Sequence, residues 1–125
     1  NDADPARRAP FGQDLFALIT PLSAGFSRDD HEALGAAMRQ AATTALEAAF
    51  AEAGGADVLL SLANLQAPFY ATAGYPAITV PTGRTDSGEP VGITLIGRKG
   101  QDAALLAFAY AFEQMTRGHI AATLP

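Results

Sequence analysis

The stretch AGYPAITVPTGRTDSGEPVGITLIG, residues 73–97, decides the fold of this chain. Two short runs within it, 77–80 and 91–96, are rich in Ile, Val and Thr, which suit a pleated, half-buried backbone. Pro76 and Pro81 bracket the first run, as expected where a strand interior must keep its ladder hydrogen bonds. The residues between the runs include Gly, Asp, Ser and Pro, which favour turns. The pattern predicts a β-hairpin with a long polar loop. Because each run is apolar on both faces, it also predicts a sheet covered on both sides.

The residues before the hairpin predict one long helix and one short strand. Ser27 and Asp30 have the spacing of a capping box, in which a hydroxyl and a carboxylate satisfy free amides of the first helical turn. Apolar residues then recur at helical spacing until the glycine pair at 54–55, which favours a helix end. The apolar run 56–62 predicts a buried strand, and residues 63–73 predict a loop or a broken helix.

A final helix is predicted from residue 101 or 102 to Gly118. Its first turns are apolar nearly all round, so this helix should be largely buried. The short apolar piece 11–20, between Pro10 and Pro21, also predicts a helix. The elements then follow the order helix, helix, strand, strand, strand, helix. We therefore predict an α/β fold, with a mixed sheet that contains an antiparallel hairpin and is covered by helices. We expect a single segment over residues 1–125, with residues 1–10 as a flexible lead-in.

Composition excludes several classes of function. The net charge of −5 and the pI of about 4.7 give no basic surface for nucleic acid, and no polybasic segment attracts an anionic membrane. No apolar run approaches the roughly 18 residues of a spanning helix. The chain has no Cys, which excludes disulfides and thiolate nucleophiles and fits a reducing, cytoplasmic location. His31 and His119 lie far apart without a metal-ligand spacing, so no metal is expected. No Gly-x-Gly-x-x-Gly or Walker loop is present, so no nucleotide cofactor is expected either.

The hairpin stretch resembles the closing part of the amidase signature family. Members of that family carry a G-x-P-A-[IL]-[TS]-[VL]-P-x-G segment, a short loop, then G-x-P-V-G-[IL]-x-[LF]-[IV]-G and a final helix. Residues 74–83 read GYPAITVPTG and residues 88–97 read GEPVGITLIG, so both segments match in order and spacing. The family's D-x-[LV]-[LV]-x-P-[TS] strand fits from Asp57 to Ser61, but Leu62 stands where the family has Pro. The resemblance implies a C-terminal fragment of the amidase signature fold.

The family's reactive groups have no counterpart in this sequence. Amidase signature enzymes use a Ser nucleophile, a second Ser that relays the proton and a Lys base, because a hydroxyl needs an adjacent base to attack an amide. The chain has one lysine, Lys99, in a polar turn, where a solvated ammonium is the simplest interpretation. No Gly/Ser-rich loop with paired serines is present, and the serines are isolated: Ser23, Ser27, Ser61 and Ser87. The expectation is that no catalytic residue lies in this chain.

The resemblance leaves a role in lining the substrate pocket. In the family, the loop between this strand and the hairpin tends to face the substrate channel. Carried over by position, the pocket candidates are Asn64, Gln66, Phe69, Tyr70 and Thr72. The alternative is that the two aromatic side chains pack in the core and the amide side chains cap a loop.

Two functions from different classes follow. In the first, the chain is the C-terminal portion of a hydrolase that cleaves the carbon–nitrogen bond of a small-molecule amide through a serine acyl-enzyme. It would then supply scaffold and pocket wall, be inactive alone, and expose apolar surface where the upstream half packs. In the second, the chain is a non-catalytic module derived from such an enzyme, which associates with itself or with a partner through that apolar face. An unrelated α/β domain would have to share all the matching Gly and Pro positions by coincidence.

Overall fold

The computed structural model describes residues 3–8, 10 and 12–121. These residues fall into two compact units, 1–34 and 35–125, and each is described by itself. That both units belong to one amidase domain stays a prediction. So does the flexibility expected for residues 1–10, of which the described part contains a short helix, α1 (Pro5–Arg8).

The first unit holds α2 (Asp14–Ser23) and the start of α3 (Arg28–Glu52). The predicted capping box is confirmed. The backbone N–H of Ser27 donates to Oδ2 of Asp30 at 2.8 Å, and the N–H of Asp30 donates to Oγ of Ser27 at 3.1 Å. Hydrogen bonds from the Ser27 hydroxyl and N–H also lower the pKa of Asp30 below its usual value, so the carboxylate stays charged in the positive first turn. This reciprocal pair explains why the long helix begins at this point.

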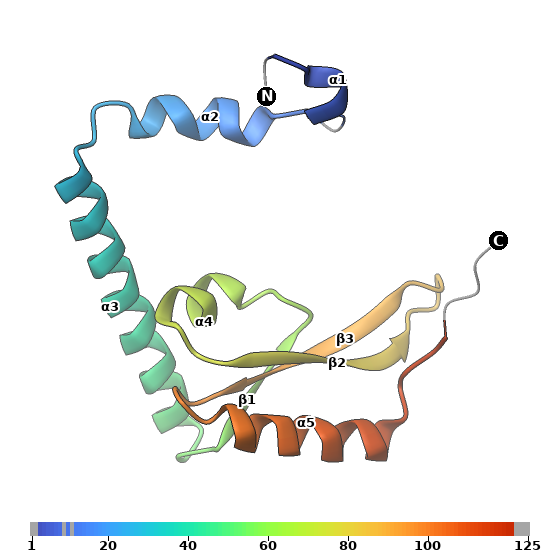
Figure 1. Ribbon diagram of the computed structural model, residues 1–125. Helices are drawn as coiled ribbons and strands as arrows, with labels where there is room; N and C mark the ends of the chain where they lie inside the picture. Colours follow the sequence, from blue (N-terminus) through green and yellow to red (C-terminus); the bar gives the residue numbers. More distant parts are fainter. Residues whose placement is uncertain (1–2, 9, 11, 122–125) are drawn as a thin grey trace. The chain divides into compact units, whose positions relative to one another are not determined.

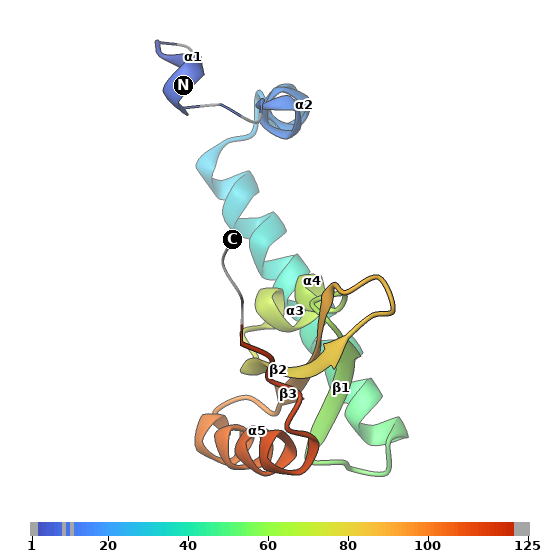
Figure 2. The ribbon, with the colours of Figure 1, turned by 90° about the vertical axis from the view of Figure 1, so that its right-hand side faces the viewer.

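The second unit is built on a three-stranded sheet: β1 (Val58–Leu62), β2 (Ala77–Arg84) and β3 (Pro90–Gly97). The strand order is β1-β3-β2, and β1 lies at one border of the sheet (Figure 2). The predicted hairpin is confirmed, since β2 and β3 pair antiparallel with Thr79 opposite Thr94.

One detail of the predicted fold was wrong: the sheet in the described chain is antiparallel rather than mixed. We expected a mixed sheet, in which the antiparallel hairpin would also have a parallel neighbour. β1 and β2 do run in the same direction, but β3 lies between them and pairs antiparallel with both. The parallel neighbours are thus separated, as in a split βαβ unit.

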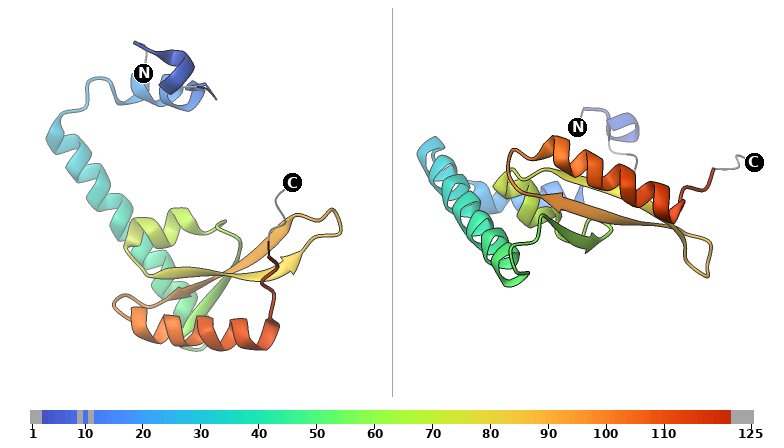
Figure 3. Two further views of the ribbon diagram at one scale, coloured as in Figure 1. Left: turned by 45° about the vertical axis from the view of Figure 1, so that its right-hand side comes forward. Right: turned by 90° about the horizontal axis from the view of Figure 1, so that it is seen from below.

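Helices cover both faces of this sheet, as predicted. α3 and α4 (Ala67–Ala73) lie over one face, and α5 (Asp102–Thr116) lies along the other (Figures 1 and 3). A buried cluster lies between α3, α4 and the sheet: Ala42, Leu46, Phe50, Ala73, Tyr75 and Ile96. A second cluster lies under α5: Val80, Leu95, Leu105 and Ala109. The adjacent residues Leu95 and Ile96 belong to different clusters, as strand alternation requires.

The expectation that α5 is largely buried was wrong for the chain as it stands. Only Leu105 and Ala109 are buried, and large apolar side chains on the rest of the helix are exposed: Leu106, Phe108, Tyr110 and Met115. α5 approaches the sheet closely at Gly97, where a Cβ would lie 3.3 Å from the Cβ of Leu105. The helix therefore packs with one narrow face and presents the remainder of its apolar surface to solvent.

Within the described ranges, no helix combines the length and the apolar character needed to cross a membrane.

Candidate functional site

The predicted pocket loop leaves β1 through a single strained residue, Ala63. Its backbone has φ = 46°, in the left-handed region that residues with a Cβ rarely adopt. Two bonds to β3 hold it there: the Ala63 N–H donates to the Gly92 carbonyl at 2.9 Å, and the Ala63 carbonyl accepts from the hydroxyl of Thr94, which is 1% exposed. The direction in which the chain leaves β1 is thus fixed by its neighbouring strand.

A turn then leads into α4. The carbonyl of Asn64 accepts the N–H of Ala67 at 2.9 Å, and a proline in the first turn of the helix needs no N–H partner there. The helix ends at Gly74, whose φ of 73° is the left-handed conformation that glycine adopts without steric cost. The loop or broken helix predicted here is therefore a turn followed by a short helix, bounded by the left-handed residues Ala63 and Gly74.

Two of the five predicted pocket residues, Gln66 and Phe69, line one groove of about 430 Å³. We call it the α3 groove, because its other walls come from α3 and from the adjacent strands: Ala45, Leu46, Ala49, Leu59, Leu60 and Ile96. Gln66 supplies the single polar side chain among these lining residues. Its size and its mostly apolar lining with one hydrogen-bonding group are typical of a small-molecule site.

The structure does not bring the other three candidates into that groove. Thr72 lines a separate hollow of about 240 Å³, to which Phe69 also contributes. Tyr70 is half-buried and packs against the cluster under α3, which matches the alternative that it is a core residue. Asn64 is exposed on the turn and lines neither hollow.

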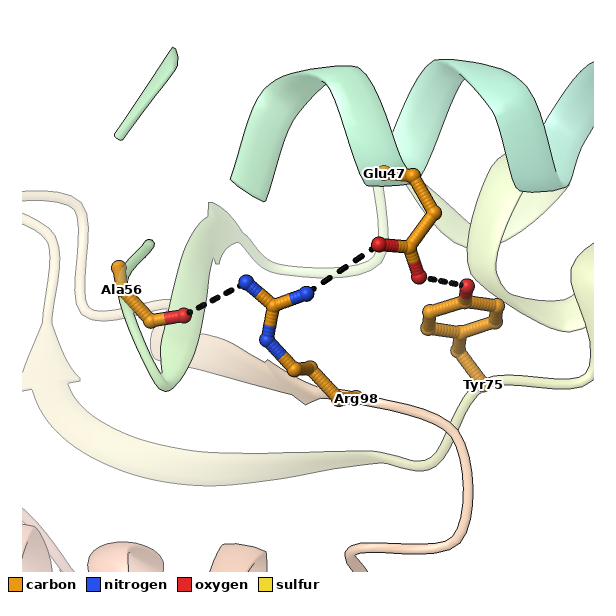
Figure 4. Close-up of polar contacts among 4 residues, drawn as sticks. All are labelled: Glu47, Ala56, Tyr75 and Arg98. Atoms are coloured by element: carbon orange, nitrogen blue, oxygen red, sulfur yellow. Dashed lines mark hydrogen bonds and ion pairs between the residues drawn. The ribbon is translucent and has the colours of Figure 1, made fainter. Parts of the chain in front are cut away.

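A polar cluster beside the α3 groove was missed by sequence reasoning (Figure 4). The hydroxyl of Tyr75 donates to Oε1 of Glu47, and Nη1 of Arg98 lies 3.2 Å from Oε2 of the same carboxylate. The Arg98 guanidinium also lies 4.3 Å from the ring centroid of the fully buried Phe50 and contacts the Ala56 carbonyl at 3.5 Å. The cluster joins α3 to the residues just before β2 and to the turn after β3.

This cluster raises the pKa of Tyr75. The hydrogen bond to Glu47 is the main cause, burial of the phenol adds to it, and Arg98 opposes both in part. The cluster could not have been found from spacing, because Glu47 and Arg98 are 51 residues apart. One feature of the sequence could have indicated the groove: the small residues Ala45 and Ala49 lie four residues apart, on one face of a long helix.

None of the serines in the described part of the chain is hydrogen-bonded to a lysine or a histidine. Each hydroxyl has a different partner: Ser23 with the Thr20 carbonyl, Ser27 with Asp30, Ser61 with the Leu62 carbonyl and Ser87 with Thr85. Lys99 is exposed in its turn. Within the same residues, no three His, Cys, Asp or Glu side chains are grouped so as to hold a metal ion. Among the described residues, these serine hydroxyls therefore have no lysine or histidine partner of the kind that activates a nucleophile.

A family model described as Amidase matches residues 20–106, which include the hairpin and the whole groove-forming region. This chain belongs to the amidase family.

Solved structures agree in fold over nearly the whole chain. An amidase family protein from Bacillus anthracis str. Ames is 29% identical, with a TM-score of 0.84 over 99% of this chain and 24% of that protein. The native peptide amidase from Stenotrophomonas maltophilia is 27% identical, with a TM-score of 0.72 over 96% of this chain and 27% of that protein.

Relatives known by sequence match a shorter part. A glutamyl-tRNA(Gln) amidotransferase subunit from Thermodesulfovibrio yellowstonii is 47% identical over 47 residues, which are 38% of this chain and 10% of the relative. A putative amidase from Synechocystis sp. is 42% identical over 53 residues, again 10% of the relative. The chain thus matches about a tenth of the length of these curated relatives and about a quarter of the solved ones.

Proposed function

We propose that this chain forms the C-terminal portion of a cytoplasmic amidase that cleaves the carbon–nitrogen bond of a small-molecule amide through a serine acyl-enzyme. In such a reaction a serine oxygen attacks the amide carbonyl, the amine leaves with a proton, and water then releases the acid. The chain supplies scaffold and pocket wall, and polypeptide outside residues 1–125 supplies the reactive groups. The family match over residues 20–106 is the observation that carries the proposal.

Within the pocket wall, we assign the main contact with substrate to Gln66 and Phe69. Both line the α3 groove, and Phe69 is 45% exposed. A carboxamide both donates and accepts hydrogen bonds, so Gln66 is chemically matched to an amide substrate. Asn64 and Thr72 contribute from the neighbouring surface, whereas Tyr70 holds α4 in place.

The test uses an amidase in which residues 1–125 are joined to the rest of its polypeptide. Replacement of Gln66→Leu or Phe69→Ala is expected to lower kcat/KM for amide substrates roughly tenfold, as loss of a substrate contact does. Gln101→Leu, at an exposed glutamine that does not line the α3 groove, is the matched control and should leave kcat/KM unchanged. Unchanged kinetics in both groove variants would remove these residues from the pocket wall.

The chain alone is expected to hydrolyse no amide. If purified residues 1–125 turn over an amide and Ser61→Ala abolishes the turnover, the reactive groups lie within this chain and the proposal is wrong.

The second candidate is a non-catalytic module that associates with itself or a partner. The observation in its favour is the set of large apolar side chains that are more than half exposed in the second unit: Met38, Leu60, Leu62, Leu65, Leu106, Tyr110 and Met115. Sedimentation at micromolar concentration separates the two. A stable, stoichiometric oligomer favours the module, whereas a compact, unaggregated monomer argues against both the module and the exposed apolar face expected of an amidase portion.

A further inference from the structure

The face of the sheet toward α3 and α4 carries a row of three hydroxyl side chains, one from each strand. Ser61 of β1 lies opposite Thr94 of β3, and Thr94 lies opposite Thr79 of β2. Ser61 and Thr94 are the two buried polar residues among those that the structure describes. The Oγ1 atoms of Thr79 and Thr94 lie 2.8 Å apart, and we call these two residues the hydroxyl pair.

The chemistry of the groups involved fixes the direction of the hydrogen bonds in the hydroxyl pair. A carbonyl oxygen can only accept, so the bond between Thr94 and the Ala63 carbonyl uses the Thr94 proton. Because a hydroxyl has one proton, Thr94 must accept in its contact with Thr79, and Thr79 must donate. The bonds therefore form a chain from Thr79 through Thr94 to Ala63, in which each bond strengthens the next.

Gly92 leaves the space in which Thr79 takes part in this chain of bonds. A Cβ at Gly92 would lie 2.7 Å from Cγ2 of Thr79, so a larger residue would displace that methyl group. Thr79 is β-branched, and its methyl and hydroxyl groups therefore turn together about one bond. The Gly92 carbonyl also accepts the Ala63 N–H at 2.9 Å, so β3 holds both backbone polar groups of Ala63.

The chain of hydrogen bonds ends where the segment 64–73 begins. The φ of 46° at Ala63 costs free energy, so a conformation of lower energy is open to this residue once its carbonyl is released. Three residues further on, Gln66 is the N-cap of α4, and its carbonyl accepts the Phe69 N–H at 3.0 Å. A change of direction at Ala63 would therefore move the two side chains of this segment that line the α3 groove.

We propose that Thr79 and Thr94 are positioning residues for the substrate contacts of Gln66 and Phe69. Neither member of the hydroxyl pair lines the α3 groove. Both act through Ala63, whose left-handed backbone they hold, and so set where the two groove side chains stand relative to a bound amide. The effect on substrate rests on the proposed function, whereas the effect on the backbone of the segment does not.

A simpler account is that the hydroxyls only satisfy a buried carbonyl. On that account, removal of the Thr94 hydroxyl lowers the stability of the whole sheet, and all amides of the sheet exchange faster by the same factor. Positioning predicts a local effect instead, confined to the start of the segment. Hydrogen exchange of individual amides separates the two accounts.

The first experiment measures amide hydrogen exchange of the 125-residue chain by NMR. In Thr94→Val, exchange of the Ala63 and Ala67 amides is expected to rise roughly tenfold more than that of Gly97. The Gly97 amide donates to the Pro76 carbonyl at 2.9 Å and serves as the reference for opening of the sheet. Thr94→Ser, which keeps the hydroxyl, should restore slow exchange. An equal increase at all three amides would overturn the proposal.

Thr79→Val tests the outer member of the hydroxyl pair. It removes the donor to Thr94, so exchange at Ala63 should rise by a smaller factor in the same direction, and Thr79→Ser should reverse the rise. Thr79 is exposed, so this variant tests the chain of bonds even if Thr94→Val fails to fold. An unchanged Ala63 amide in Thr79→Val would remove Thr79 from the proposed role.

The second experiment uses the amidase in which residues 1–125 are joined to the rest of its polypeptide. Thr94→Val is expected to raise KM for amide substrates roughly fivefold with a smaller change in kcat, because the reactive groups lie elsewhere. Thr94→Ser should restore KM. Thr82→Val is the matched control, since it removes a hydroxyl that donates to the Val91 carbonyl at 3.1 Å in the same hairpin, and it should leave KM unchanged.

The two experiments keep this proposal distinct from the proposed function. Unchanged KM in Thr94→Val, or a raised KM that Thr94→Ser does not restore, overturns the positioning of substrate contacts. Unchanged kinetics in Gln66→Leu and Phe69→Ala instead rejects the pocket wall, even where the local exchange effect is found.

Discussion

At the scale of single residues, Tyr75 in the second unit has a raised pKa that follows from a hydrogen bond and from burial. It is 7% exposed, its ring stacks on Phe50 with centroids 6.5 Å apart, and its hydroxyl donates to Glu47. Loss of that proton would remove the hydrogen bond and place a phenolate beside a carboxylate. The neutral phenol is therefore part of the folded structure.

Because the folded state raises the pKa of Tyr75 above 10.0, its contribution to stability is full below about pH 10 and is lost as the pH rises through the folded pKa. We expect Tyr75→Phe to lower the free energy of unfolding by about 1 kcal/mol at pH 8, where the hydrogen bond is intact. The deficit should disappear as the pH rises above 10.

Urea unfolding of both proteins between pH 8 and pH 11 measures this difference. Tyr110→Phe, at a phenol 66% exposed, serves as the control and should match the unsubstituted chain throughout. A Tyr75→Phe deficit that stays constant across this range would contradict the proposed coupling to Glu47.

At the scale of elements, Ala63 joins β1 to the segment 64–73, proposed above as pocket wall, in a conformation that suits glycine. A left-handed backbone costs a residue with a Cβ about 1–2 kcal/mol, and part of the gain on removing it is offset by the greater freedom of glycine in the unfolded chain. We expect Ala63→Gly to raise the free energy of unfolding by up to about 1 kcal/mol. Ala63→Val should lower it, because a β-branched residue is least tolerant of positive φ.

Urea midpoints of the two variants test this pair in opposite directions. Thr94→Val provides a further comparison, since it removes the hydroxyl that holds the Ala63 carbonyl. If Ala63→Val and Ala63→Gly have the same midpoint, the backbone at residue 63 is not strained.

Local sequence signals predicted the elements, and contacts distant in sequence explain what they could not predict. Prolines and glycines located the hairpin, and Ser27 with Asp30 located the start of α3, because each acts within a few residues. The position of β3 between β1 and β2 depends on pairing between distant segments, and so does the Glu47–Arg98 contact. Among the pocket candidates, position along the loop could not show which side chains face the groove, because α4 turns Tyr70 toward the core.

At the scale of the whole molecule, the two units differ in what they bury. The sheet and both buried clusters lie within residues 35–125, whereas α2 has no buried residue. Burial of apolar surface is the main source of folding stability, so the second unit should dominate cooperative unfolding.

We therefore expect removal of residues 1–26, which leaves the capping box of α3 intact, to change the free energy of unfolding by less than about 0.5 kcal/mol. Urea unfolding followed by circular dichroism would measure it, with the full 125-residue chain as reference. A clear drop in the midpoint after truncation would show that the first unit stabilises the sheet.

The segment between Ala63 and Gly74 begins and ends at left-handed backbone turns, and its first turn is held by β3. Because both ends of this segment have a fixed backbone conformation, its sequence can be replaced without a change in the strands on either side. Its outward side chains can diverge, or be grafted from one amidase to another, while the scaffold beneath keeps its register. With this segment as the proposed pocket wall, new specificity would need changes at a few surface positions and no redesign of the sheet.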